Sequence, residues 1–208
     1  MASRSASRTG ATCAIVGGVL LLVGTALHPL GADPNEAGAA FAEYSADKLW
    51  VTSHLTQLAG LILMVAALLA LAHQLEAGRG AAWARVAAGG ASTSLALAAT
   101  LQAVDGIALK TMVDTWAAAP AAQKEATFYA AYAVRQVEIG LASVLSLCFG
   151  LTVSVYGSAL LADQTYPSWL GGLAVVAGAS SAVAGIVMAA TGFWGWRWRS
   201  AWRQVPSC

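Results

Sequence analysis

The chain contains five long apolar runs that hold no charged side chain, and these runs limit the folds open to it. They cover residues 11–30, 49–75, 86–104, 139–162 and 164–196. Each run approaches or exceeds the roughly 20 residues that an α-helix needs to cross a bilayer. A helix satisfies its backbone N–H groups without water, and runs this long without alternation do not fit barrel strands. The sequence therefore predicts an all-α integral membrane protein, a five-helix transmembrane bundle.

The spans and the segments around them follow from charge and turn residues. We expect spans at about 11–29, 49–75, 83–109, 121–161 and 169–193, all within a single bundle of residues 1–193. Between the first two spans, Asp33-Pro34 is typical of a helix start. We therefore expect a short amphipathic segment in this loop, with Phe41 and Tyr44 touching the membrane. Residues 194–208 alternate Trp and Arg, which predicts an interfacial tail.

Composition excludes several other classes. Only 10% of the residues are charged and the net charge is +1, whereas a soluble domain has about 25% charged residues. This balance gives no reason to expect a nucleic-acid partner. Cys13, Cys148 and Cys208 are too scattered for a disulfide framework or a paired zinc motif. The expected partners are membrane lipid and a lipophilic small molecule, and the sequence does not indicate an oligomeric state.

Arginines indicate the orientation in the membrane. Arg4, Arg8, Arg79 and Arg85 fall at one end of the predicted bundle, and positive charge in short loops marks the cytoplasmic side. We therefore expect a multi-pass protein of the cell membrane with a cytoplasmic N-terminus. The first run could be a secretory signal, but it ends in His-Pro-Leu without a small-residue cleavage site, so we interpret it as a retained span.

The ionisable residues of four spans gather at the opposite end, which would then be the outer one. His28 ends the first span, His54 opens the second, Asp105 ends the third, and Arg135 and Glu138 open the fourth. Three of these helices carry polar pairs spaced by three residues, which share a helix face. The pairs are His54 with Gln57, Gln102 with Asp105, and Arg135 with Glu138. Because lipid offers no partners, these faces are expected to point inward.

The sequence leaves four alternative functions for this cluster of ionisable residues. The favoured one is a polar pocket that opens outward and binds a small lipophilic or amphiphilic ligand through His28, His54, Gln57, Gln102, Asp105, Arg135 and Glu138. A second is a membrane-embedded lyase, isomerase or cyclase, with Asp105, Glu138 and His54 as acid–base groups. A third is a structural subunit in which Arg135 pairs with Asp105 between helices, as an ion-pair lock. The fourth is a metal or haem held by His28 and His54 with a carboxylate. No metal or cofactor is expected under the favoured use.

Several short motifs are similar to those of a broader group. They are His28-Pro29, Val104-Asp105-Gly106, Ala108-Leu109-Lys110, Trp116, Arg135-Gln136-Val137-Glu138-Ile139-Gly140 and Thr191-Gly192-Phe193. In these motifs the chain resembles small multi-spanning bacterial membrane proteins of actinobacterial type, which have no assigned function. The resemblance covers residues 11–193. It implies an integral membrane protein and supplies no catalytic residues.

Overall fold

The computed structural model describes residues 2–163 and 165–193, and within these residues it is all-α, without strands. Its elements are α1 (Ala2–Leu27), α2 (Ala37–Ala46), α3 (Trp50–Gln74), α4 (Ala81–Gln102), the π-helix η1 (Ala103–Leu109), α5 (Lys110–Ala118), the 3-10 turn η2 (Ala121–Gln123), α6 (Lys124–Asp163) and α7 (Ser168–Thr191). The predicted tail, residues 194–208, lies outside the described residues.

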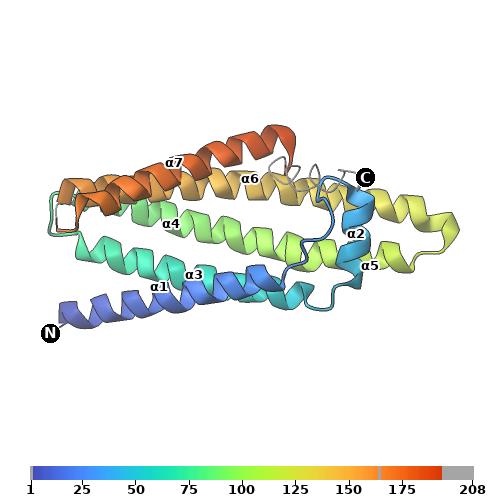
Figure 1. The fold of residues 1–208 in the computed structure, drawn as a ribbon, viewed down its shortest axis with the longest axis horizontal. Coiled ribbons are helices and arrows are strands. Elements are labelled where there is room, and N and C mark those ends of the chain that lie inside the picture. Colours follow the sequence, from blue (N-terminus) through green and yellow to red (C-terminus); the bar gives the residue numbers. More distant parts are fainter. Residues whose placement is uncertain (1, 164, 194–208) are drawn as a thin grey trace, which may run out of the picture.

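Five helical stretches are long and apolar enough to cross a membrane, as expected for a multi-pass membrane protein. They are Ser7–Leu27, Trp50–Gln74, Ala81–Ala118, Ala121–Asp163 and Ser168–Thr191. The third helical stretch continues past residue 109, where the third span is expected to end, because η1 runs directly into α5. At 1.5 Å per residue the 40 residues of α6 extend about 60 Å. The α5–α6 end therefore projects past the other spans (Figure 1).

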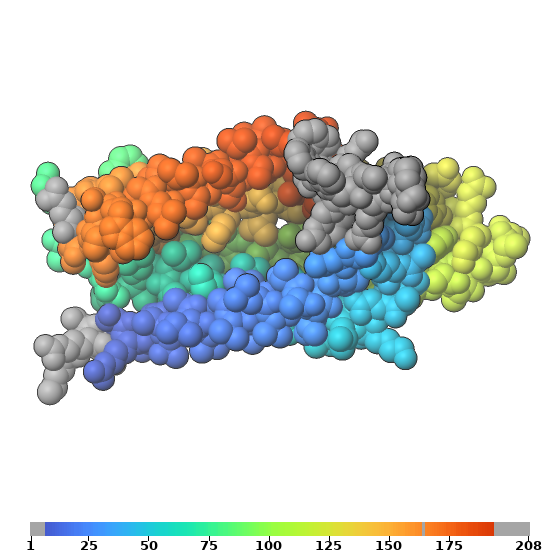
Figure 2. All heavy atoms as spheres, viewed as in Figure 1, coloured from blue at the N-terminus to red at the C-terminus, as the bar shows by residue number. Residues whose placement is uncertain are grey.

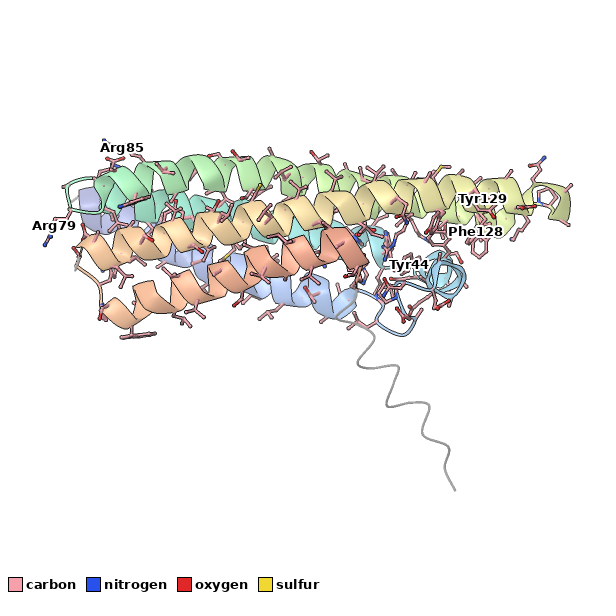
Figure 3. All side chains as sticks on the ribbon, turned by 90° about the horizontal axis from the view of Figure 1, so that it is seen from above. Tyr44, Arg79, Arg85, Phe128 and Tyr129 are labelled. Carbon is pink, nitrogen blue, oxygen red and sulfur yellow. The ribbon has the colours of Figure 1, made fainter. Side chains whose placement is uncertain are left out.

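The spans form an open crescent. Packing runs from α1 to α3, then α4, α6 and α7, and Figure 1 shows the helices side by side in this order. Viewed along the layer, α1 and α7 lie on the same side and α4 lies on the other (Figure 3). The space-filling view shows a hollow between α1 and α7 (Figure 2). The concave face of the crescent therefore opens between its two edge helices.

Close glycine contacts hold the edge helices in place. A Cβ on Gly17 of α1 would lie 2.8 Å from the carbonyl oxygen of Gly60 in α3. A Cβ on Gly150 of α6 would lie 2.5 Å from the carbonyl oxygen of Gly178 in α7. In a membrane such small residues let two backbones pack closely, where van der Waals contact is the main attraction. Gly17 and Gly150 therefore allow α1 to approach α3, and α6 to approach α7, at backbone contact distance.

The loop helix α2 docks on the protein. Phe41 is completely buried and Tyr44 is 5% exposed; both lie in an apolar cluster with Trp50, Leu109 and Val113. The expectation that Phe41 and Tyr44 touch the membrane is therefore wrong. The reason is that α5 and the first turns of α6 extend far enough to offer these rings an apolar protein surface. This packing fixes α2 across one end of the crescent (Figure 1).

Candidate functional site

His54 and Asp105 form a close contact between α3 and η1, which is an ion pair when the imidazole is protonated. The Nε2 atom of His54 lies 3.0 Å from Oδ2 of Asp105, and His54 is 2% exposed. The π-helix carries Asp105, and π-helical turns inside α-helices occur often at functional sites. Gly106 makes the approach possible, since a Cβ there would lie 2.6 Å from Cβ of His54. The indole Nε1 of Trp50 donates to the Asp105 carbonyl oxygen at 3.1 Å, which ties the start of α3 to η1.

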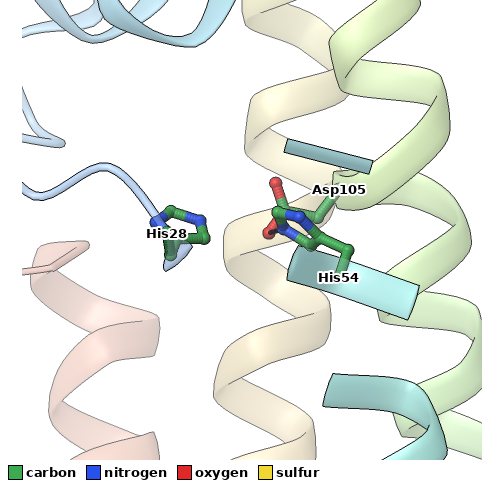
Figure 4. Close-up of side chains that lie close together, drawn as sticks. All are labelled: His28, His54 and Asp105. Atoms are coloured by element: carbon green, nitrogen blue, oxygen red, sulfur yellow. Dashed lines mark hydrogen bonds and ion pairs between the residues drawn. The ribbon is translucent and has the colours of Figure 1, made fainter. Parts of the chain in front are cut away.

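His28 lies directly after α1, beside this pair (Figure 4). Its ring centroid is 5.1 Å from that of His54 and 4.8 Å from that of Trp50. Its Nδ1 atom lies 2.9 Å from the carbonyl oxygen of Pro29. Burial lowers the pKa of His28 below its ordinary value, because a charged imidazolium loses hydration in this position. The imidazole is therefore neutral at physiological pH.

Arg135 and Glu138 form a second buried pair, within α6. The Arg135 Nη1 atom lies 2.7 Å from Oε2 of Glu138, and the two residues are 5% and 3% exposed. The guanidinium also lies over the rings of Tyr44 and Phe193 at 5.5 and 4.9 Å and donates to the Pro34 carbonyl oxygen at 3.4 Å. Arg135 thus contacts the α1–α2 loop, α2 and the residue that follows Gly192.

The pairing expected between helices is not the observed one. Arg135 was expected to pair with Asp105, but Asp105 pairs with His54 and Arg135 pairs with Glu138 one turn further along its own helix. Side chains three residues apart on a helix can already contact each other. Glu138 can therefore pair with Arg135 whatever the positions of the neighbouring helices. Lys110 pairs with Asp114 and donates to the carbonyl oxygens of Tyr44 and Ser45.

The remaining polar pair links α3 to α4. Gln102 Nε2 donates to Oε1 of Gln57 at 3.3 Å, and Gln102 is 8% exposed. Its own Oε1 atom is buried and has no hydrogen-bond partner. The inward placement predicted for the polar cluster is therefore confirmed for His54, Gln102, Arg135 and Glu138, all of which are buried.

A polar pocket of about 190 Å³ lies beneath the α1–α2 loop. Four of the predicted residues line it, namely His28, Asp105, Arg135 and Glu138, whereas His54, Gln57 and Gln102 do not. The rest of its lining is Pro29, Leu30, Ala32, Pro34, Glu43, Tyr44 and Phe193.

Seven of the lining residues were not predicted as part of a site, and two of these, Glu43 and Tyr44, bring polar side-chain groups. The Glu43 carboxylate accepts hydrogen bonds of 2.8 Å from the backbone N–H groups of Gly31 and Ala32, which fixes the loop over the pocket. Burial raises the pKa of Tyr44 to about 12, so its phenol stays neutral. The signal in the sequence was the helical periodicity of the loop segment, which placed Tyr44 on an apolar face but did not say what that face covers.

A second cavity lies deeper along the bundle. It also measures about 190 Å³ and is lined by residues of α3, α4, α6 and α7, namely Leu61, Val65, Ser94, Leu95, Ala98, Leu145, Ser146, Phe149 and Ser181. The hydroxyl oxygen of Ser94 is buried and has no hydrogen-bond partner. Sequence reasoning missed this cavity, because single serines within apolar spans give no sign that they share a space.

Comparison with known protein families, with curated proteins and with solved structures finds no match for the chain. The resemblance to small bacterial membrane proteins therefore identifies no family.

Proposed function

We propose that this membrane protein binds a small amphiphilic molecule on the concave face of the crescent. The polar pocket supplies charged and neutral hydrogen-bonding groups at one end, from Asp105, Arg135, Glu138 and Tyr44. Such a set suits the polar headgroup of an amphiphile, which it would hold by a few convergent polar contacts in an otherwise apolar surrounding. The combination of this pocket with an apolar cavity in the same bundle is the observation that carries the proposal.

The deeper cavity suits the apolar part of the same molecule. Its lining is mainly Leu, Val, Ala and Phe, with serine hydroxyls as the polar exceptions. Because α3 and α7 both contribute to a cavity floored by α4 and α6, this space belongs to the inner side of the crescent. The unpartnered hydroxyl of Ser94 offers one hydrogen bond to a ligand group there.

The ligand would enter sideways from the bilayer. The crescent is hollowed between α1 and α7 (Figure 2), so an acyl or prenyl chain could slide in without crossing the polar end. Arg79 and Arg85 lie at the far end from Tyr44 (Figure 3). By the positive-inside rule, the polar pocket then belongs to the outer leaflet and the N-terminus to the cytoplasm.

A second candidate function is acid–base chemistry on a lipophilic substrate. The observation that favours it is the buried His54–Asp105 pair at 3.0 Å, in which a carboxylate orients an imidazole that could carry a proton. Asp105 and Glu138 both line the pocket and could face a bound substrate. A lyase, isomerase or cyclase would use such groups.

The purely structural alternative has less support. The lock predicted between Arg135 and Asp105 is not formed, since both members of the Arg135–Glu138 pair are on α6, although the His54–Asp105 contact does join α3 to η1. What Arg135 does fix is the loop, through Pro34 and Tyr44. That contact shapes the pocket rather than the bundle.

The test uses two serines of α4 that differ in their surroundings. Ser94→Leu fills the deep cavity, whereas Ser92→Leu adds the same atoms at a position exposed on the surface of α4. The wild type and the two variants are purified in mild detergent. Native mass spectrometry measures any retained small molecule, and solvent extraction then identifies it. We expect the wild-type chain and Ser92→Leu to retain one amphiphile, and Ser94→Leu to lose it. Equal retention by both variants, or no retained molecule in the wild type, would refute the proposal.

A further inference from the structure

Three side chains from separate elements bring metal-ligating atoms together beside the polar pocket. One nitrogen of His28, one nitrogen of His54 and one carboxylate oxygen of Asp105 all lie within 4.8 Å of one another. His28 follows α1, His54 belongs to α3 and Asp105 to η1, so only the tertiary fold assembles the group (Figure 4). Two imidazoles with one carboxylate are a common ligand set for divalent transition metals.

Backbone carbonyls determine which nitrogen of each imidazole is free. The His54 Nδ1 atom lies 2.7 Å from the Trp50 carbonyl oxygen, and the His28 Nδ1 atom lies 2.9 Å from that of Pro29. A carbonyl oxygen only accepts hydrogen bonds, so Nδ1 must carry the hydrogen in both rings. Each neutral ring is then left with a lone pair on Nε2. Metal-binding histidines are held in this way, with the other N–H bonded to a carbonyl or carboxylate.

The lone pair of His54 faces a negative group. Its Nε2 atom lies 3.0 Å from Asp105 Oδ2, and a lone pair and a carboxylate oxygen repel each other unless a proton or a cation lies between them. Two ligand atoms about 2.1 Å from one tetrahedral ion are separated by about 3.4 Å, so the observed contact lies a few tenths of an ångström inside the spacing of two ligands that share an ion. The other carboxylate oxygen of Asp105 is buried without a hydrogen-bond partner, which leaves it free for the same ion.

From this geometry we infer that His28, His54 and Asp105 bind one divalent transition-metal cation of the Zn²⁺ class. Imidazole ligands disfavour Mg²⁺ and Ca²⁺, which prefer all-oxygen sites, and no thiolate belongs to the group, as Cu(I) would prefer. Three protein ligands leave a coordination position open, as in catalytic rather than structural zinc sites. Both His28 and Asp105 line the polar pocket, so that position would face the pocket. This inference goes beyond the amphiphile proposal and does not rest on it.

The competing interpretation is an ion pair alone. A proton between Nε2 and Oδ2 would make His54 an imidazolium that donates to both Trp50 and Asp105, with His28 packed against the Trp50 ring. That arrangement needs no metal and gives His28 no ligand role. His28 is therefore the residue that separates the two interpretations.

The experiment measures metal binding by the full chain, purified in detergent without a polyhistidine tag and stripped with EDTA. Zn²⁺ is titrated by calorimetry, and Co²⁺ by its visible absorption, for the wild type and for His28→Ala, His54→Ala and Asp105→Asn. His73→Ala is the matched control, because His73 is the third histidine of the chain and is exposed beside Glu76. Circular dichroism and size exclusion establish that each variant is folded. If the two helix variants misfold, His28→Ala decides the question, because His28 lies outside the helices.

We expect one ion per chain for the wild type and for His73→Ala. Each of the three ligand variants should weaken binding by more than the roughly 10- to 100-fold that loss of an outer-shell partner costs. Absence of stoichiometric binding by the wild type, or unchanged affinity in His28→Ala, would overturn the inference. Retention of the amphiphile is measured separately on the metal-free protein, so failure of the metal site and failure of the ligand proposal give different results.

Discussion

The buried Arg135–Glu138 pair gives a quantitative test of how the polar end of the bundle is held together. Two unit charges 2.7 Å apart attract each other by about 6 kcal/mol at an effective dielectric constant of about 20. Loss of hydration offsets much of this attraction, so the net stabilisation by an intact buried pair is small. Removal of one partner is different, because the other charge then stays buried without compensation. We expect Glu138→Met to lower the free energy of unfolding by about 3–5 kcal/mol.

Arg135→Met should cost more than Glu138→Met. It also removes the cation–π contacts with Tyr44 and Phe193, each of which contributes about 0.5–1 kcal/mol. The double variant should be no less stable than Arg135→Met alone, which corresponds to a coupling energy at least as large as the cost of Glu138→Met, about 3–5 kcal/mol. The measurement is a double-mutant cycle in mixed micelles, with unfolding followed by circular dichroism.

His73 and Glu76 supply the matched control. They are also three residues apart, at 3.0 Å, where α3 ends and the following turn begins, but their side chains are 69% and 56% exposed. Their coupling energy should stay below about 0.5 kcal/mol. An Arg135–Glu138 coupling as small as this would refute the argument from burial. The same double variant also tests whether the two charges serve ligand binding or only the structure. If it is stable and still retains the amphiphile, Arg135 and Glu138 have no role in binding.

Four further predictions concern packing and protonation. Gly106→Ala would place a Cβ 2.6 Å from Cβ of His54, and chemical denaturation should show a loss of about 1–3 kcal/mol. Gly150→Val would separate α6 from α7 and should lower the stability by a similar amount. Disulfide cross-linking between cysteines placed across this contact measures the separation. Phe41→Ala removes a completely buried ring and should cost about 3–5 kcal/mol, whereas Tyr129→Ala, at a position that is 61% exposed, should change little. The folded chain keeps the Tyr44 proton up to about pH 12, whereas the unfolded chain loses it near its ordinary pKa of 10. Stability should therefore fall as pH rises through this window, and Tyr44→Phe should flatten that part of a denaturation profile.

The sequence alone determined that the chain crosses a membrane as helices, and at which end the ionisable side chains, which are unfavourable in lipid, gather. Uncharged runs of sufficient length leave no other way to satisfy the backbone in lipid. The same cost requires groups such as His54, Arg135 and Glu138 to avoid lipid, and the structure buries them. The alternation of spans placed these groups at one end, because successive helices run in opposite directions.

The tertiary structure decided which of these groups meet. The choice between Glu138 and Asp105 as the partner of Arg135 depends on ångström distances between helices, which periodicity does not contain. The π-helix that carries Asp105 and the contact at Gly106 that admits His54 have no local signal in the sequence. The crescent and its two cavities depend on which helices pack side by side. Helix packing is set by the whole surface of each helix, so the sequence could name His28 and His54 with a carboxylate, but only the tertiary structure shows that Asp105 is the carboxylate that lies close to both.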